Sequence, residues 1–107
     1  MKSPYVQNTV DTTPLQLTTK NRDSILTVAN TVAVTVVLPP SADMVGYRIT
    51  VKKTTAAGGG SAVTVDGYGA ELIDGAASTA AIDAQYDTKT FQSDGTGWHI
   101  VRSMIAP

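Results

Sequence analysis

Turn residues divide this chain into short runs that are rich in valine and threonine. The turn signals are Asn21-Arg22-Asp23, Pro39-Pro40, Gly58-Gly59-Gly60, Gly67-Tyr68-Gly69, Asp74-Gly75 and Asp94-Gly95. β-branched residues fit a pleated, half-buried surface and lose side-chain freedom in a helix. Short β-like runs between closely spaced turns are typical of sandwiches and barrels. We therefore expect an all-β protein with a compact β-sandwich or barrel-like domain.

Eight runs fit strands. They are Leu15–Thr19, Ser24–Ala29, Ala33–Leu38, Tyr47–Lys53, Ala62–Asp66, Thr79–Ile82, Tyr86–Ser93 and Trp98–Ser103. In Tyr47–Lys53, apolar and polar residues alternate, which predicts one buried face and one face in water. The buried face would carry Tyr47, Ile49 and Val51. The wet face would carry Arg48, Thr50 and Lys52.

Two local signals fix where strands end. Proline has no N–H to donate, so pairing should stop at Pro39-Pro40. Asp94-Gly95 is a strong hairpin signal, because glycine adopts a positive φ without steric cost. Phe91 and Trp98 flank this turn and are expected to pack together across the strand pair.

The first twenty residues differ from the rest of the chain. They are polar, with Pro4 and Pro14 and a few scattered apolar residues. We expect an N-terminal arm over residues 1–20, laid along a neighbouring subunit, and a β-sandwich-like domain over residues 21–107. A frayed terminus is the alternative. With such an arm, deletion of residues 1–20 should leave the β body folded.

The sequence lacks the groups on which most enzymes and cofactor sites depend. Cysteine is absent, which excludes disulfides and thiolate metal sites. Asp66 and Asp74 each precede a glycine and are interpreted as turn residues rather than as part of a glycosidase pair. We therefore expect no enzyme activity, no catalytic residue, no cofactor and no metal site. The net charge of −1 gives no basic footprint for nucleic acid, and no apolar run is long enough for a membrane helix.

Composition favours contacts with other subunits, although small secreted domains share the same pattern. Charged residues make up 16% of the chain and aromatic residues 6%, against a charged fraction of about 25% in an average soluble domain. The single histidine, His99, lies on an expected strand and is interpreted as a surface or interface residue. Tyr68, Tyr86 and Trp98 could form a platform for a sugar, although core or interface positions are more typical. The expected interface residues are Tyr5, Val6, Val10, Leu15, Phe91, Trp98 and His99.

Six segments in order resemble a small β module of tailed-bacteriophage virion proteins. They are Leu38-Pro39, Gly46–Lys53, Ala62–Val65, Ile73–Ala76, Gln85–Asp87 and Ser93–Trp98. The resemblance covers about Thr27 to Val101. Gly97 stands where asparagine is frequent in that module, and His99 where an aromatic residue is frequent, so the contacts of the hairpin tip differ. The resemblance implies a β-sandwich-like module, usually a trimer, used in tail fibres, spikes, head fibres and capsid decoration proteins.

Two functional hypotheses follow from the resemblance. The first is a homotrimeric capsid decoration (cement) or head-fibre protein in the virion, bound to the major capsid protein or another virion protein. The second is a tail-fibre or tailspike module that binds a host glycan. The chain begins with Met1 and ends soon after its last expected strand, which we take to favour the first. The trimer contact is expected on the faces that carry Val34, Val36, Ile49 and Val51.

Overall fold

The computed structural model of the chain describes residues 6–55, 62–79 and 82–104. As expected, the regular structure of these residues is all-β apart from two short 3-10 helices. The strands are β1 (Val6–Thr9), β2 (Leu15–Gln16), β3 (Ser24–Val28), β4 (Val34–Val37), β5 (Arg48–Lys53), β6 (Val63–Asp66), β7 (Thr88–Ser93) and β8 (Trp98–Met104). The 3-10 helices are η1 (Thr19–Asn21) and η2 (Ser41–Asp43). No helix in the described ranges is long and apolar enough to cross a membrane.

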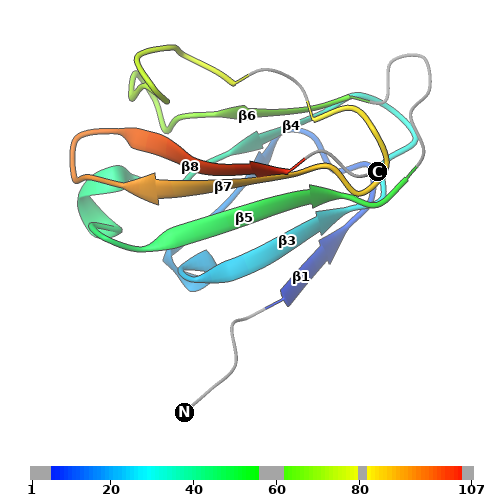
Figure 1. The fold of residues 1–107 in the computed structure, drawn as a ribbon, viewed down its shortest axis with the longest axis horizontal. Coiled ribbons are helices and arrows are strands. Elements are labelled where there is room, and N and C mark those ends of the chain that lie inside the picture. Colours follow the sequence, from blue (N-terminus) through cyan, green and yellow to red (C-terminus); the bar gives the residue numbers. More distant parts are fainter. Residues whose placement is uncertain (1–5, 56–61, 80–81, 105–107) are drawn as a thin grey trace.

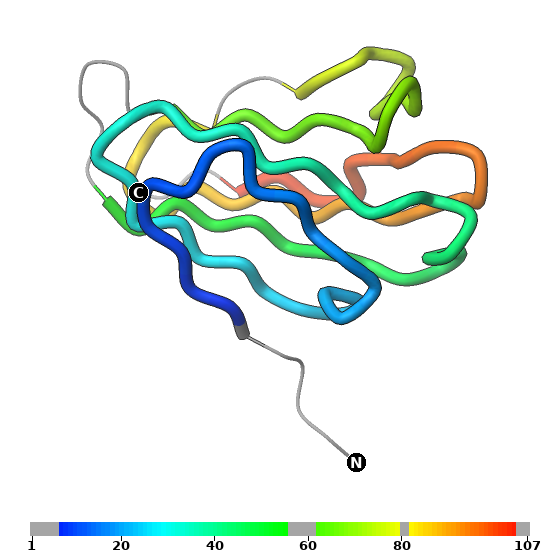
Figure 2. The backbone as a smooth tube through the Cα atoms, turned by 180° about the vertical axis from the view of Figure 1, so that it is seen from behind, coloured from blue at the N-terminus to red at the C-terminus, as the bar shows by residue number. Residues whose placement is uncertain are grey.

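The strands form two sheets, between which the chain alternates. A five-stranded sheet has the order β1-β3-β5-β7-β8, and a three-stranded sheet has the order β2-β4-β6. Up to β6, each strand pairs in parallel with the strand two places along the chain. Parallel strands need a crossover connection, and here the crossover passes through the opposite sheet (Figures 1 and 2). β7 then pairs antiparallel with β5, and β8 antiparallel with β7.

Alternation along the strands explains which side chains are buried. In β4, Val34 and Val36 are buried while Thr35 and Val37 are partly exposed. Tyr47 was expected on the buried face of the run Tyr47–Lys53, but it precedes β5 and is exposed. In β5 itself, Ile49 and Val51 are buried. The expectation that these four apolar side chains form a trimer contact is therefore wrong, because they fill the interior of their own chain.

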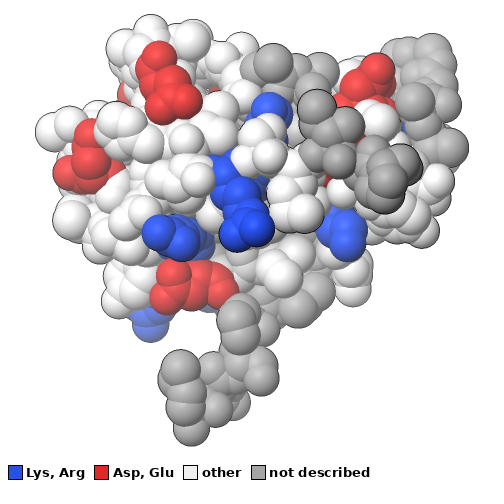
Figure 3. All heavy atoms as spheres, viewed as in Figure 1, with Lys and Arg blue, Asp and Glu red and all other residues white. Residues whose placement is uncertain are grey.

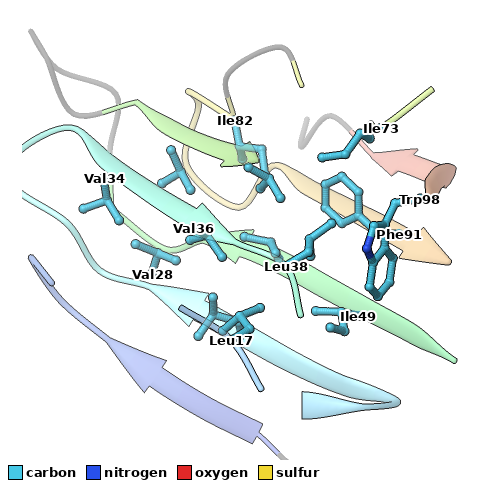
Figure 4. Close-up of a cluster of buried hydrophobic side chains, with 14 of the residues drawn as sticks. Leu17, Val28, Val34, Val36, Leu38, Ile49, Ile73, Ile82, Phe91 and Trp98 are labelled. Atoms are coloured by element: carbon cyan, nitrogen blue, oxygen red, sulfur yellow. The ribbon is translucent and has the colours of Figure 1, made fainter. Parts of the chain in front are cut away.

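The core lies between the two sheets (Figure 4). Its members are buried apolar side chains from both sheets and from the connections between them. They are Leu17, Leu26, Val28, Val34, Val36, Leu38, Met44, Ile49, Val51, Val63, Val65, Ile73, Ile82, Phe91 and Trp98. Transfer of such side chains out of water is the main stabilising contribution to a fold of this size.

The described part of the expected arm, residues 6–20, belongs to this body. β1 pairs with β3 at the edge of the five-stranded sheet, and β2 pairs with β4 at the edge of the three-stranded sheet. Leu17 is buried in the core. Residues 6–20 therefore lie in the sheets and core of their own body rather than as a free arm. The boundary at residue 20 otherwise remains a prediction.

Three expected strands differ clearly in extent. The run Leu15–Thr19 is a strand only over Leu15–Gln16, and Thr19 begins η1. The run Tyr86–Ser93 begins only at Thr88, because Tyr86 takes a positive φ of 69° in the turn before β7. In the run Thr79–Ile82, Ile82 forms one isolated bridge with Val63. Residues 80 and 81 lie outside the described residues.

Candidate functional site

The five-stranded sheet presents one face away from the core, which we call the outer face. Strand register arranges its side chains in rows that cross the sheet. The middle row contains Ile25, Thr50, Thr90 and Arg102. The rows on either side contain Arg48, Gln92 and His99, and Thr27, Lys52, Thr88 and Met104.

An irregularity in β8 adds one more side chain to this face. Phe91 pairs with Ile100 and Thr90 with Arg102, so the register shifts by one residue between them. The extra residue is Val101, which is exposed. Such a bulge bends and twists the strand locally. Arg102 is therefore presented on the same side as Thr90.

Side-chain contacts order the outer face. The hydroxyl oxygens of Thr50 and Thr90 lie 2.9 Å apart across β5 and β7. Arg48 Nε donates to Gln92 Oε1 at 3.1 Å. The ammonium of Lys52 lies 5.4 Å from the centre of the Tyr86 ring, within the range of a cation–π contact. The polar groups of this face are thus held in place by neighbouring strands.

A shallow groove of about 610 Å³ crosses the outer face. Its lining residues are Asp23, Ser24, Ile25, Arg48, Thr50, Thr90, Val101 and Arg102. Asp23 stands at one end, where its N–H donates to the Arg48 carbonyl and its Oδ1 accepts from the Arg48 N–H at 3.2 Å. The groove therefore combines two guanidinium groups, the hydroxyls of Thr50 and Thr90, two apolar side chains and one carboxylate, that of Asp23.

Positive charge gathers on this face. Arg48, Lys52 and Arg102 all project from it. Figure 3 shows basic atoms over the middle of the sheet and acidic atoms mostly toward its margins. The whole chain carries a net charge of −1. The excess of positive charge on this face therefore comes from the distribution of the charged residues and not from a basic composition. The outer face is the candidate binding surface.

His99 forms a second polar cluster at the hairpin end of the sheet. Its Nε2 lies 2.6 Å from Asp94 Oδ2, and its Nδ1 lies 3.5 Å from Asp74 Oδ1. The hydrogen bond to Asp94 raises the pKa of His99 above its ordinary value. Asp94 also accepts from the N–H groups of Thr96 and Gly97, and these bonds with that to His99 hold the pKa of Asp94 well below its usual range.

This cluster connects two turns. Asp94 belongs to the β7–β8 turn, and Asp74 to the turn that lies beside the start of β8, where the Trp98 N–H donates to the Leu72 carbonyl. Its polar groups are largely occupied with one another. Within the described ranges, no group of three or more histidine, cysteine or acidic residues could hold a metal ion. We interpret the cluster as a structural link between turns.

The structure separates the residues that the sequence analysis placed at interfaces. His99 and Val10 are exposed, and Leu15 packs partly buried against the core. Val6 begins the edge strand β1, and Tyr5 lies outside the described residues.

Phe91 and Trp98 were also expected at an interface, and that expectation is wrong. They are 0% and 1% exposed, because both point inward and pack in the core of their own chain. Trp98 is therefore also unable to contribute to a sugar platform. Arg102 was missed, since the bulge that directs it outward leaves no signal in the local residue pattern.

Comparisons with known proteins add no family to this description. No protein-family model matches the chain, and no curated protein sequence matches it.

Proposed function

We propose that this protein is a non-enzymatic structural component of a tailed-phage virion. It acts as a homotrimeric capsid decoration (cement) or head-fibre protein that binds the capsid surface and stabilises it. Its fold is a β-sandwich made of the two sheets described above. Its partners are its own copies and the major capsid protein or another virion protein.

The observation that carries the proposal is the ordered resemblance of six sequence segments to the phage module. Three of these segments fall on framework elements of the structure. Gly46–Lys53 includes β5, Ala62–Val65 overlaps β6, and Ser93–Trp98 forms the turn between β7 and β8. These three segments are therefore structural ones, which suits a protein whose task is to hold and to bind.

The arrangement of the surface supports the same proposal. The described residues offer a broad, ordered sheet face and a shallow groove rather than a deep cleft with converging acid and base groups. Flat or shallow surfaces of this kind suit protein contacts better than small-molecule chemistry.

A receptor-binding role in a tail fibre or tailspike is the second candidate. The observation that favours it is the exposure of two aromatic rings, Tyr68 and Tyr86. Exposed tyrosine rings can stack against a host glycan. Lys52 already lies over the Tyr86 ring, which leaves that ring less available for stacking.

Localisation on the virion distinguishes these functions. Virions of the phage that encodes the protein would be treated with a gold-labelled antibody against it and imaged by electron microscopy. Labels spread over the capsid are expected. Labels confined to the tail would replace the proposal with the receptor-binding one, and unlabelled virions would overturn both. Light scattering of the purified protein should give the mass of a trimer, and a stable monomer at micromolar concentration would contradict that part.

A further inference from the structure

We propose that the outer face of the five-stranded sheet docks an extended acidic segment of a partner protein, with Arg48, Lys52 and Arg102 as its charged contacts. The inference goes beyond the proposed function, because it names the chemistry of the partner and applies equally to a capsid and to a tail protein.

The first support is that the three basic side chains lack acidic partners. In the portion of the chain that the structure describes, none of them forms an ion pair. Arg48 donates to the neutral side chain of Gln92, and Lys52 lies over the Tyr86 ring. Asp23, the acid in the groove, accepts from the Arg48 backbone N–H through one carboxylate oxygen. The positive charge of the face is therefore available to an outside carboxylate.

The second support is the spacing of the three groups. Arg48 and Lys52 project from the same side of β5, four residues apart, which corresponds to about 13 Å along a strand. Arg102 lies two strands away on β8, or about 10 Å across the sheet. In an extended segment with carboxylates on alternate residues, two carboxylates that are four residues apart also lie about 13 Å apart. One that runs along β5 can pair with Arg48 and Lys52 together.

The third support is the surface between the charges. Ile25 and Val101 are exposed apolar side chains that line the same groove as Arg48 and Arg102. Thr50 and Thr90 supply hydroxyls in the middle of the groove. Interfaces between proteins combine apolar contact with arginine and a polar rim in this way. Nucleic acid would gain mainly from the number of phosphate contacts, and three cations on a chain of net charge −1 provide few of them.

The test uses the full chain and synthetic probes. The acidic probe is a 12-residue peptide that alternates glutamate with threonine, and the matched probe has glutamine in place of glutamate. Association is followed by NMR of backbone amides and by fluorescence anisotropy at about 50 and 300 mM salt. We expect saturable binding of the glutamate peptide only, with shifts on β5, β7 and β8. Affinity should fall at the higher salt, since exposed charges are screened.

Charge reversal identifies the contact. Arg48→Glu and Arg102→Glu should each weaken binding at least fivefold, and the neutral variants Arg48→Gln and Arg102→Gln should weaken it less. Lys89→Glu is the matched control, because Lys89 lies next to Thr90 on β7 but on the opposite side of the strand, where its Nζ donates to Ser103 Oγ. It should change binding less than twofold. Circular dichroism and urea unfolding establish that each variant is folded.

Several results would overturn the proposal. These are the absence of saturable binding, equal binding of the glutamine peptide, or an equal loss in Lys89→Glu. Tighter binding of heparin or of a thymidine oligonucleotide to the same face would identify a general polyanion site instead. Self-association that Arg48→Glu abolishes would identify an interface between copies of this chain. None of these results depends on where virions carry the protein, so the two proposals can fail separately.

Discussion

The ammonium of Lys53 lies 3.2 Å from the side-chain oxygen of Asn30, and both side chains are buried. Lys53 Nζ also donates to Thr55 Oγ1 at 2.7 Å, and Thr55 donates in turn to the Asn30 carbonyl at 2.9 Å. A charge can remain buried only when hydrogen bonds replace its hydration. This network therefore connects the segment after β3 to the end of β5.

Removal of the Asn30 side chain should destabilise the protein by more than the loss of a small polar side chain usually does. Asn30→Ala deprives a buried ammonium of one acceptor, and we expect a loss of about 2–3 kcal/mol in the free energy of unfolding. Urea unfolding followed by tryptophan fluorescence measures it. Asn8→Ala is the control: at this exposed position of β1 the Asn8 side-chain oxygen accepts from the Thr27 hydroxyl, so the substitution removes one exposed hydrogen bond between neutral groups and should cost about 1 kcal/mol or less. Equal stability of the two variants would contradict the importance of the network.

The N-terminal residues should be necessary for a stable body. A chain without residues 1–20 lacks β1, β2 and the buried Leu17. We expect it to lose cooperative thermal unfolding. The single substitution Leu17→Ala should cost about 2–4 kcal/mol, because it leaves a cavity in the core. Val10→Ala, at an exposed position, should be nearly neutral. A cooperative transition in the truncated chain at the wild-type temperature would show that residues 1–20 act as a separate arm.

Local patterns predicted the strands better than their arrangement. The alternation in Tyr47–Lys53 and the Asp94-Gly95 turn correctly predicted β5 and the hairpin of β7 and β8. Alternation is the same for parallel and antiparallel neighbours. Nothing in a single run could therefore show that β1, β3 and β5 run parallel through one sheet and β2, β4 and β6 through the other.

The candidate site was predictable only in part, for a related reason. The wet face of β5, with Arg48 and Thr50, follows from alternation alone. Arg102 reaches the same face because the bulge shifts the register of β8 by one residue. The polar composition around β1 and β2 suggested an arm. Short edge strands with one side in water also have a polar sequence. Pairing between strands decides where the face of β5, Arg102 and the strands β1 and β2 lie. Such pairing joins residues far apart in the sequence, so a local pattern does not reveal it.

Gly67 should resist substitution for a steric reason. A Cβ at this position would overlap the backbone carbonyl oxygen of Glu71 and lie 2.9 Å from its carbon. Glu71 cannot easily move, since its carboxylate accepts from the N–H and the hydroxyl of Ser41. We expect Gly67→Ala to cost about 2–3 kcal/mol in urea unfolding.

The control for this substitution is Gly69→Ala in the same loop. Gly69 has a positive φ of 56°, and a Cβ added to it would have no neighbouring atom within 4 Å, so alanine there brings backbone strain of about 1 kcal/mol without a clash. Equal effects at both positions would mean that the loop relaxes around the new methyl group and that the contact with Glu71 is unimportant.

His99 should remain protonated at a higher pH than an ordinary histidine. It is the single histidine of the chain, so its ring protons can be followed by NMR without overlap. Its hydrogen bond to Asp94 favours the charged ring and raises its pKa above 6.5. Asp94→Asn should bring the titration midpoint back toward 6.5, and Asp74→Asn should lower it by less, because its oxygen is 3.5 Å away rather than 2.6 Å.

The pH dependence of stability follows with a definite sign. A pKa raised by folding contributes stability that is complete below 6.5 and is lost as the pH rises through the folded value. Asp94 behaves in the opposite sense: its lowered pKa contributes stability above 3.8 that is lost as the pH falls through the folded value. The pair therefore stabilises the hairpin end most between about pH 4 and 6.5. Urea unfolding at pH 6 and pH 8.5 should show a decline in the wild type that His99→Gln reduces. An identical decline in both proteins, or a wild-type midpoint at or below 6.5, would mean that the contact of His99 with Asp94 does not persist in solution.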